Sequence, residues 1–309
     1  MSEHPSPSER ARELVMGAYD VHLHVAPDVM KRRIDDFTVA QRFAEVGLAG
    51  FVLKSHYVPT AERAEVVRHA GGAEAFGAIT LNASVGGMNP IAVEIAGRGG
   101  AKFVWLPTVD SANQRQCQAT EPEGATPPMW AQLQEDLRNE GMAADPVEVL
   151  AADGSVLEVT RQVLRLIARH DMVLATGHLH SDEIATVIEA AAAEGVERMV
   201  VTHPEFTSQR VGIERQQAMA ARGALLERCF TTPYTGKVEW DTWFRSIREV
   251  GPQHSVISSD LGQPFNPPVE DGLALAADRL VDAGFGDDDI RTMTVHNSRW
   301  LVGAKPLEA

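Results

Sequence analysis

Two histidines separated by a single residue stand in the apolar stretch "YDVHLHVAPD", residues 19–28. Alternate side chains of a β-strand share a face, so His22 and His24 are expected to lie side by side on one face. Val21, Leu23 and Val25 would take the other face. Two buried imidazoles are costly unless a metal ion or a carboxylate satisfies them. This stretch alone leaves open a metal site and a pair of hydrogen-bonded histidines.

Further ligand-type residues lie where other apolar runs end. They are Lys54 and His56 in "GFVLKSHY", His178 and His180 in "MVLATGHLH", His203 in "RMVVTHPE" and Asp260 in "HSVISSD". Six of the eleven histidines therefore fall at the ends of such runs. Neutral imidazoles and carboxylates are the ligands that Zn²⁺ takes, and a catalytic site keeps one position open for water. The joint pattern predicts a divalent-metal site.

The elements that must position these residues can be read from the apolar runs. Eight short runs predict strands, at residues 18–25, 50–57, 76–83, 101–108, 172–180, 198–205, 225–232 and 254–260. Helical patterns lie between most of them, one beginning after Asn89 and another capped by Ser181. Eight alternating units predict a single (β/α)8 TIM barrel over residues 1–309. An open doubly wound sheet is the alternative, but no GxGxxG loop favours it.

One segment breaks the alternation after the fourth strand. Residues 111–150 are polar and rich in Gln, Glu and Pro, and a hairpin is expected to turn at Asp153 and Gly154. We interpret residues 111–158 as an inserted loop and hairpin that form a lid or wall over the site.

Composition limits the classes of function. A net charge of -15 argues against sequence-independent binding to nucleic acid. Cys117 and Cys229 are the only cysteines, too few for a disulfide framework or a Cys-rich zinc motif. The polar start of the chain lacks the apolar core of a secretory signal, and no run of about 18 apolar residues occurs. We expect a cytoplasmic protein that acts on a small molecule, with no membrane partner; a homo-oligomer stays open.

The order of these residues resembles the amidohydrolase superfamily of metal-dependent hydrolases. The likeness rests on HxH on the first strand, single histidines on strands five and six and an aspartate on strand eight. It continues to "NSRWLVG", residues 297–303, which is similar to the closing segment of that superfamily. The resemblance implies that His22, His24 and Asp260 bind one ion, with zinc as the expected metal. It also implies that His178 and His203 bind a second ion or the substrate.

Strand four departs from that pattern. Binuclear members bridge their metals with a carboxylated lysine or a glutamate, usually on strand four, whereas "WLPTVD" offers only Asp110. Lys54 lies on strand two instead and points the same way as His56. Lys54 is therefore a candidate for carboxylation, for binding an anionic substrate group, or for pairing with a carboxylate such as Asp28.

His56 and Asp28 also resemble the polymerase-and-histidinol-phosphatase type of phosphoesterase. That family keeps a glutamate on strand three, and "AITLNASVGG" offers none. A phosphoesterase is therefore the weaker reading.

The expected activity is hydrolysis of a C–N or C–O bond in a small amide, cyclic amide, ester or lactone by a metal-activated water. Asp260 would move the proton, and Lys54, His178 or His180 would stabilise the oxyanion. His56 is a further catalytic candidate, and Asp110 and His180 are candidate substrate contacts. A decarboxylase, a phosphoesterase and a non-enzymatic metal-binding barrel are the alternatives.

Overall fold

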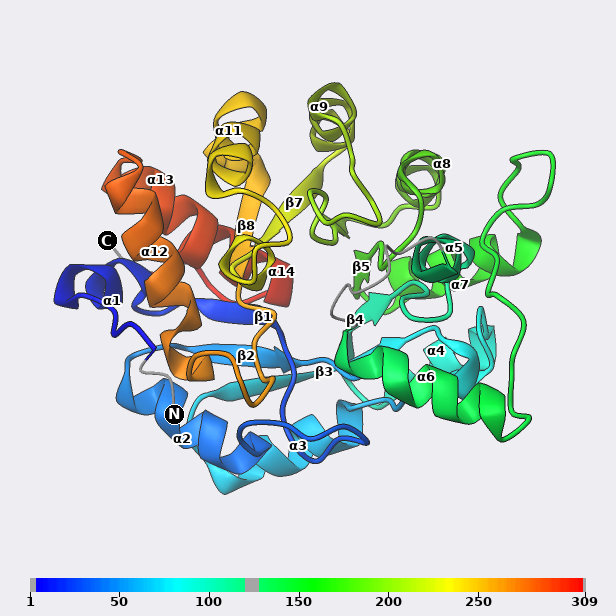
Figure 1. Ribbon diagram of the computed structural model, residues 1–309, viewed down its shortest axis with the longest axis horizontal. Coiled ribbons are helices and arrows are strands. Elements are labelled where there is room, and N and C mark those ends of the chain that lie inside the picture. The colour runs from blue at the N-terminus through cyan, green and yellow to red at the C-terminus, as the bar shows by residue number, and fades with distance from the viewer. Residues whose placement is uncertain (1–3, 120–127, 308–309) are drawn as a thin grey trace.

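The computed structural model describes residues 4–119 and 128–307, and its eight strands form one parallel sheet in the order β1 to β8 (Figure 1). The strands are β1 (Tyr19–Leu23), β2 (Gly50–Leu53), β3 (Glu74–Thr80), β4 (Ala101–Trp105), β5 (Val173–Ala175), β6 (Arg198–Val201), β7 (Ala224–Cys229) and β8 (Ser255–Ser258). Each overlaps one of the eight predicted runs. The (β/α)8 barrel is therefore confirmed.

Backbone hydrogen bonds join the first and last strands and close the barrel. The N–H of Asp260 donates to the carbonyl of His22 at 2.8 Å, and the N–H of His24 donates to the carbonyl of Leu261 at 2.8 Å. Both bonds lie at the C-terminal end of β1 and just after the end of β8. Closure is therefore made by the same residues that carry the candidate ligands.

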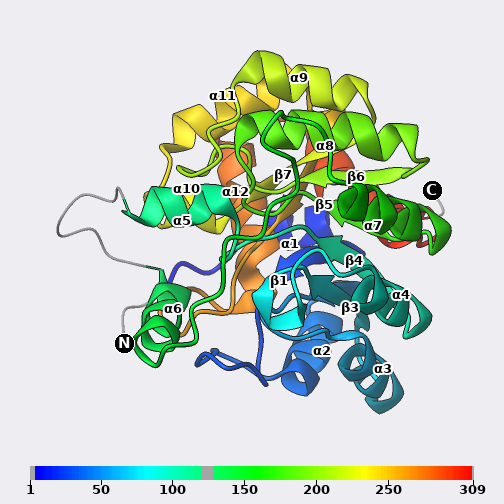
Figure 2. The ribbon, with the colours of Figure 1, turned by 90° about the vertical axis from the view of Figure 1, so that its right-hand side faces the viewer.

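Helices surround the strands on the outside (Figures 1 and 2). Those between successive strands include α2 (Asp36–Glu45), α3 (Ala61–Ala70), α4 (Pro90–Arg98), α7 (Glu158–Arg169), α8 (Ser181–Ala193), α9 (Ile213–Ala221), α10 (Thr231–Tyr234) and α11 (Trp240–Val250). At the ends of the chain lie α1 (Glu9–Val15), α12 (Gly272–Asp282), α13 (Asp287–Arg291) and α14 (Asn297–Val302). In the described part of the chain, no helix has the length and apolar character needed to cross a membrane.

Two predicted helix starts have different outcomes. Asn89 caps α4 as expected, because its side chain accepts the N–H groups of Ile91 and Ala92. The prediction that Ser181 caps α8 is wrong. The cap is His180. Its ring nitrogen Nδ1 accepts the N–H of Asp182, and its backbone N–H donates to the Glu183 carboxylate. The three-residue spacing from His180 to Glu183 forms this reciprocal pair, and Ser181 becomes the first helical residue.

The barrel interior is filled by apolar side chains from all eight strands. They are Tyr19, Val21, Val52, Ala78, Phe103, Trp105, Val173, Ala175, Val200, Leu225 and Val256. Leu301 and Val302 of the C-terminal segment join this cluster. In the same segment, the Ser298 hydroxyl accepts the N–H of Tyr19, which gives "NSRWLVG" a structural role. Two outer clusters pack the strands against the helices.

The first strand does not alternate regularly. Val21 belongs to the interior cluster, whereas Leu23 and Val25 belong to an outer one. The expectation that all three share a face is wrong, because the pairing of β1 with β2 shifts register between Asp20 and Leu23. Such a bulge re-aims the side chains that follow it.

The segment after β4 is more regular than a loop. It contains α5 (Ala112–Ala119) and α6 (Met129–Asn139), so the expectation of a loop is wrong at these residues. Residues 120–127, part of the expected insertion, lie outside the described residues. The hairpin is present, since Leu150 and Val156 bridge antiparallel around the turn.

Gly262 yields a prediction that links the fold to the site. Its φ is +128°, and a Cβ built there would lie 1.6 Å from the carbonyl oxygen of His24. We expect Gly262→Ala to lower the free energy of unfolding by about 3 kcal/mol, because strain and overpacking add. Displacement of His24 should also weaken metal binding. Calorimetry and metal analysis on one preparation measure both effects.

Gly284→Ala is the matched control. Gly284 has a φ of +84° with nothing within 4 Å of the added Cβ, so only the backbone cost of about 1–2 kcal/mol applies. Equal effects of the two substitutions would show that contact with His24 does not matter.

Candidate active site

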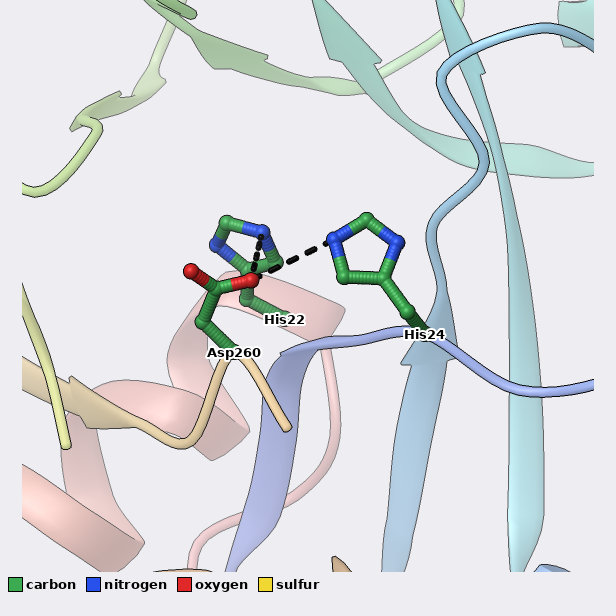
Figure 3. A group of neighbouring side chains, drawn as sticks. All are labelled: His22, His24 and Asp260. Carbon is green, nitrogen blue, oxygen red and sulfur yellow. Dashed lines mark ion pairs between the residues drawn. The ribbon is translucent and has the colours of Figure 1, made fainter. Parts of the chain in front are cut away.

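Asp260 lies beside both His22, in β1, and His24, just after that strand (Figure 3). Its Oδ1 atom is 3.2 Å from Nε2 of His22 and 3.2 Å from Nε2 of His24. Both histidines are buried, whereas the Asp260 side chain keeps 24% of its surface exposed. These three residues therefore present two imidazole nitrogens and a carboxylate to a point that solvent can reach.

Two more charged side chains hold the His22 ring. Its Nδ1 lies 3.0 Å from Oε1 of Glu227, and its Nε2 lies 2.8 Å from Nζ of Lys54. Glu227 comes from β7, where it follows Leu225 by two residues and points the same way into the barrel. A carboxylate on Nδ1 orients the ring and, in the neutral form, fixes the tautomer whose lone pair is on Nε2.

Glu227 was not among the predicted site residues. The signal was present, since "LLERCF" places a carboxylate in an otherwise apolar strand on the inward face. Lys54 does not pair with Asp28, because Asp28 pairs with Arg32 instead.

The three remaining histidines complete a ring of imidazoles. Ring centroids are 5.0 Å apart for His24 and His56, 6.1 Å for His56 and His178, and 5.0 Å for His178 and His203. The Nδ1 atoms of His178 and His203 are buried without a hydrogen-bond partner among the described residues. Such atoms are costly unless a ligand satisfies them.

Electrostatics prepare the histidines as ligands. Burial lowers the pKa of His203 to about 4 and holds the pKa values of His24, His56 and His178 well below the ordinary value. These rings are therefore neutral near pH 7, the form that binds a metal.

His22 and Asp260 show where positive charge is favoured. Burial and the Lys54 ammonium oppose protonation of His22, but the carboxylates of Asp260 and Glu227 outweigh them and raise its pKa to about 9. Burial opposes ionisation of Asp260, but the neighbouring His22 and His24 hold its pKa well below the usual range. The space between these residues therefore favours a cation.

Two of the candidate residues adopt left-handed backbone conformations. The φ angles are +51° at Asp260 and +25° at His203, each two residues after the end of a strand. Asparagine and aspartate tolerate this region better than most residues, whereas histidine there is uncommon. The turns re-aim both side chains toward the barrel mouth.

A cavity of about 500 Å³ opens beside these residues. It is lined by Lys54, by His24, His56, His178 and His203, and by Asp260. Pro128, Met129 and Trp130 at the start of α6 form part of its wall. Those residues of the expected insertion therefore contribute to the site.

The structure does not bring Asp110 and His180 into this cavity. Asp110 is buried, pairs with Arg115 and accepts the N–H of Ala83. His180 is 54% exposed at the start of α8 and lines a separate hollow. Both were candidate substrate contacts. In the structure, Asp110 is engaged in an ion pair and His180 caps a helix.

The donor set fits a divalent ion. Ligand atoms of His22, His24 and Asp260 lie within 4.8 Å of one another, as do those of His22, Glu227 and Cys229. Burial and nearby carboxylates raise the pKa of the Cys229 thiol well above its usual range, which disfavours the thiolate that a metal requires. The first group, with the unpartnered rings of His178 and His203 nearby, is the better candidate.

Comparisons with known proteins bear on the family and on the fold of this chain. The model of a "Family of unknown function (DUF6282)" matches residues 17–227. A search of curated proteins finds no matching sequence.

Solved structures with a similar fold include an amidohydrolase from Pseudomonas aeruginosa, with 11% identity, a TM-score of 0.58, and coverage of 96% of this chain and 98% of that one. The probable dipeptidase PvdM from Pseudomonas aeruginosa has 11% identity, a TM-score of 0.57 and 96% coverage of both chains. A probable 2-pyrone-4,6-dicarboxylic acid hydrolase from Acinetobacter baumannii, with citric acid bound, has 11% identity, a TM-score of 0.55, and coverage of 93% of this chain and 100% of that one. At these identities the likeness concerns the fold.

The geometry predicts metal content. We expect purified protein to hold one or two divalent ions per chain, zinc first among them, and the double variant His22→Ala/His24→Ala to lose them, because two imidazole ligands disappear. Elemental analysis by mass spectrometry after gel filtration measures the ratio.

Two controls make this specific. His180→Ala removes an exposed histidine outside the cavity and should keep the metal, and Cys229→Ser should keep it if the thiol is not a ligand. Unchanged metal in the double variant would refute the assignment of His22 and His24.

Proposed function

The chain belongs to the family of unknown function DUF6282, and we propose that it is a metal-dependent hydrolase of the amidohydrolase type. We propose that it cleaves a C–N or C–O bond of a small amide, cyclic amide, ester or lactone. The observation that carries this proposal is the contact of Asp260 with His22 and His24 at the mouth of the barrel. The names of the dipeptidase and pyrone hydrolase of similar fold support it.

His22, His24 and Asp260 would hold the ion, with His178 and His203 beside it. A divalent ion in such a site lowers the pKa of water toward neutrality and polarises a scissile carbonyl. The protein supplies the remaining work: it orients the rings, bounds the cavity and moves the proton.

Asp260 is the proposed proton carrier. Its carboxylate is ionised, partly exposed and next to the cavity, so it can accept a proton from the attacking water and pass it to the leaving group. The second carboxylate, Glu227, is buried and engaged with His22 and the Ser258 hydroxyl. Asp260 therefore is the carboxylate placed to meet substrate.

Lys54 is the proposed oxyanion contact. Its Nζ lies 2.8 Å from His22, 5.1 Å from the centre of the Trp105 ring, and lines the cavity. A positive charge there stabilises negative charge that develops on the substrate oxygen. Carboxylation of Lys54 is the alternative use of this amine.

Asp260→Asn tests the function. Asn keeps the size and tolerates the left-handed backbone of Asp260, but it cannot accept the proton. We expect the variant to keep most of its metal and its melting temperature, and to lose turnover by about 10²- to 10⁴-fold.

The assay uses protein reconstituted with zinc and a panel of small lactones, esters, dipeptides and cyclic amides, followed by pH-stat titration. A folded, metal-loaded and fully active Asp260→Asn variant would sink the mechanism. Release of carbon dioxide without hydrolysis would point to a decarboxylase instead.

A second prediction concerns Lys54. We expect turnover to fall by about 10²-fold or more in Lys54→Ala, because removal of an oxyanion donor has an effect of this size in other enzymes. We expect the rates to be independent of added bicarbonate. Steady-state rates with and without added bicarbonate or acetate provide the measurement. Rescue of Lys54→Ala by short carboxylic acids would replace the cationic role with a carboxylated lysine.

A further inference from the structure

Arg32 is a buried cation at the wall of the same cavity that none of the chemistry above uses. Its side chain is only 3% exposed, yet it lines the cavity beside His24. We propose that Arg32 binds a carboxylate of the substrate, so that the enzyme acts on small anionic molecules with an apolar or aromatic body. This inference rests on the proposed function of the site.

Asp28 orients the guanidinium and leaves part of it free. Both Nε and Nη2 of Arg32 lie 2.7 Å from Oδ2 of Asp28, which is itself 1% exposed. Nη2 also lies 3.4 Å from Nδ1 of His24. Nη1 has no hydrogen-bond partner within residues 4–119 and 128–307. An arginine that lines a cavity, with a carboxylate on one edge and a further nitrogen without a partner among the described residues, is suited to bind an anion.

The loop that carries Arg32 is held on both sides. Arg33 donates its N–H to the carbonyl of Gly262 and its guanidinium to the carbonyls of Pro264 and Asn266 in the loop after β8. Arg63 of α3 pairs with Asp36 and donates to three carbonyls in residues 25–27. Arg32 is therefore preorganised, which reduces the entropic cost of binding.

The charge balance of the cavity favours an anion. Among the described residues that line it, Arg32, Lys54 and Lys237 are cationic and Asp260 is the single carboxylate. Lys237 follows α10, is exposed and has no ion-pair partner in the described part of the chain. A chain of net charge -15 thus concentrates positive charge at one opening.

Another part of the lining is apolar. Met129 and Trp130 of α6, Phe206 after β6 and Phe265 after β8 all contribute to it, and Phe265 is 62% exposed. An exposed aromatic side chain at the rim of a cavity is typical of a ligand contact. The site therefore matches a molecule with a carboxylate at one end and a flat apolar body at the other.

The probe is a matched pair, phenylacetate and its neutral isostere phenylacetamide. Titration calorimetry is done on the wild-type protein, both with zinc and after chelation. We expect phenylacetate to bind at least about 10-fold more tightly than the amide in both forms, because a hydrogen bond to a charged group is worth that much.

Arg32→Gln should raise the Kd of phenylacetate by about 10- to 100-fold and so remove the preference for the acid over the amide. Lys237→Gln should reduce that preference by a smaller factor. Lys31→Gln is the matched control, since Lys31 is the exposed neighbour and does not line the cavity. Arg32→Gln leaves the buried Asp28 carboxylate without its partner, so the double variant Asp28→Asn/Arg32→Gln is measured beside it.

Equal binding of acid and amide, or an unchanged preference in both Arg32 variants, would overturn the inference. A preference seen only with zinc and unaffected by Arg32 would assign the carboxylate to the metal and overturn it too. These measurements need no turnover. Failure of every hydrolysis assay would therefore refute the proposed function and leave the anion site standing.

Discussion

The pairing of β1 with β8 is the constraint on which the site depends. Two backbone hydrogen bonds, from Asp260 to His22 and from His24 to Leu261, close the barrel and set the Asp260 carboxylate between two imidazoles. Residues distant in sequence are thereby placed by main-chain geometry, which is far stiffer than side-chain packing. The close approach of Gly262 to the His24 carbonyl belongs to the same junction. A change that disrupts the backbone bonds between the first and last strands is therefore expected to displace the candidate ligands as well.

A buried cluster this polar is stable only if its charges compensate each other. Glu227 and Asp260 flank the His22 ring, and Lys54 approaches the same ring from a third direction. Each member lowers the cost of burying the others, so removal of one leaves its neighbours uncompensated. The network also divides two functions between its carboxylates. Glu227 fixes the orientation of His22, whereas Asp260 keeps an exposed oxygen for chemistry.

The eight strands and the residues at their ends were predictable because apolar runs and strand alternation are local signals. The barrel brings together His22, His24 and Asp260 as expected. The contacts among the site residues were harder to predict, because they depend on which inward-facing side chains meet across the barrel. Glu227 was missed for that reason. The start of α8 was misplaced by one residue, because the capping pair of His180 with Glu183 makes His180, not Ser181, the cap. The register shift in β1 likewise depends on how β1 pairs with β2, so the sequence of β1 alone does not reveal it.

The proposed roles divide between strands and loops. The residues proposed to hold the ion or move the proton lie at the C-terminal ends of barrel strands or just after them. Arg32, Lys237 and Trp130 come from the connecting segments instead. Loops tolerate substitution better than closed strands, so substrate choice can change while the metal ligands stay in place. Surface charge beyond about 8–10 Å is largely screened at physiological salt, so the net charge of -15 does little to exclude an anion from the cavity. Selectivity for an anionic substrate therefore depends on the few cations at the opening. Among these, Arg32 is held in place by its buried ion pair with Asp28.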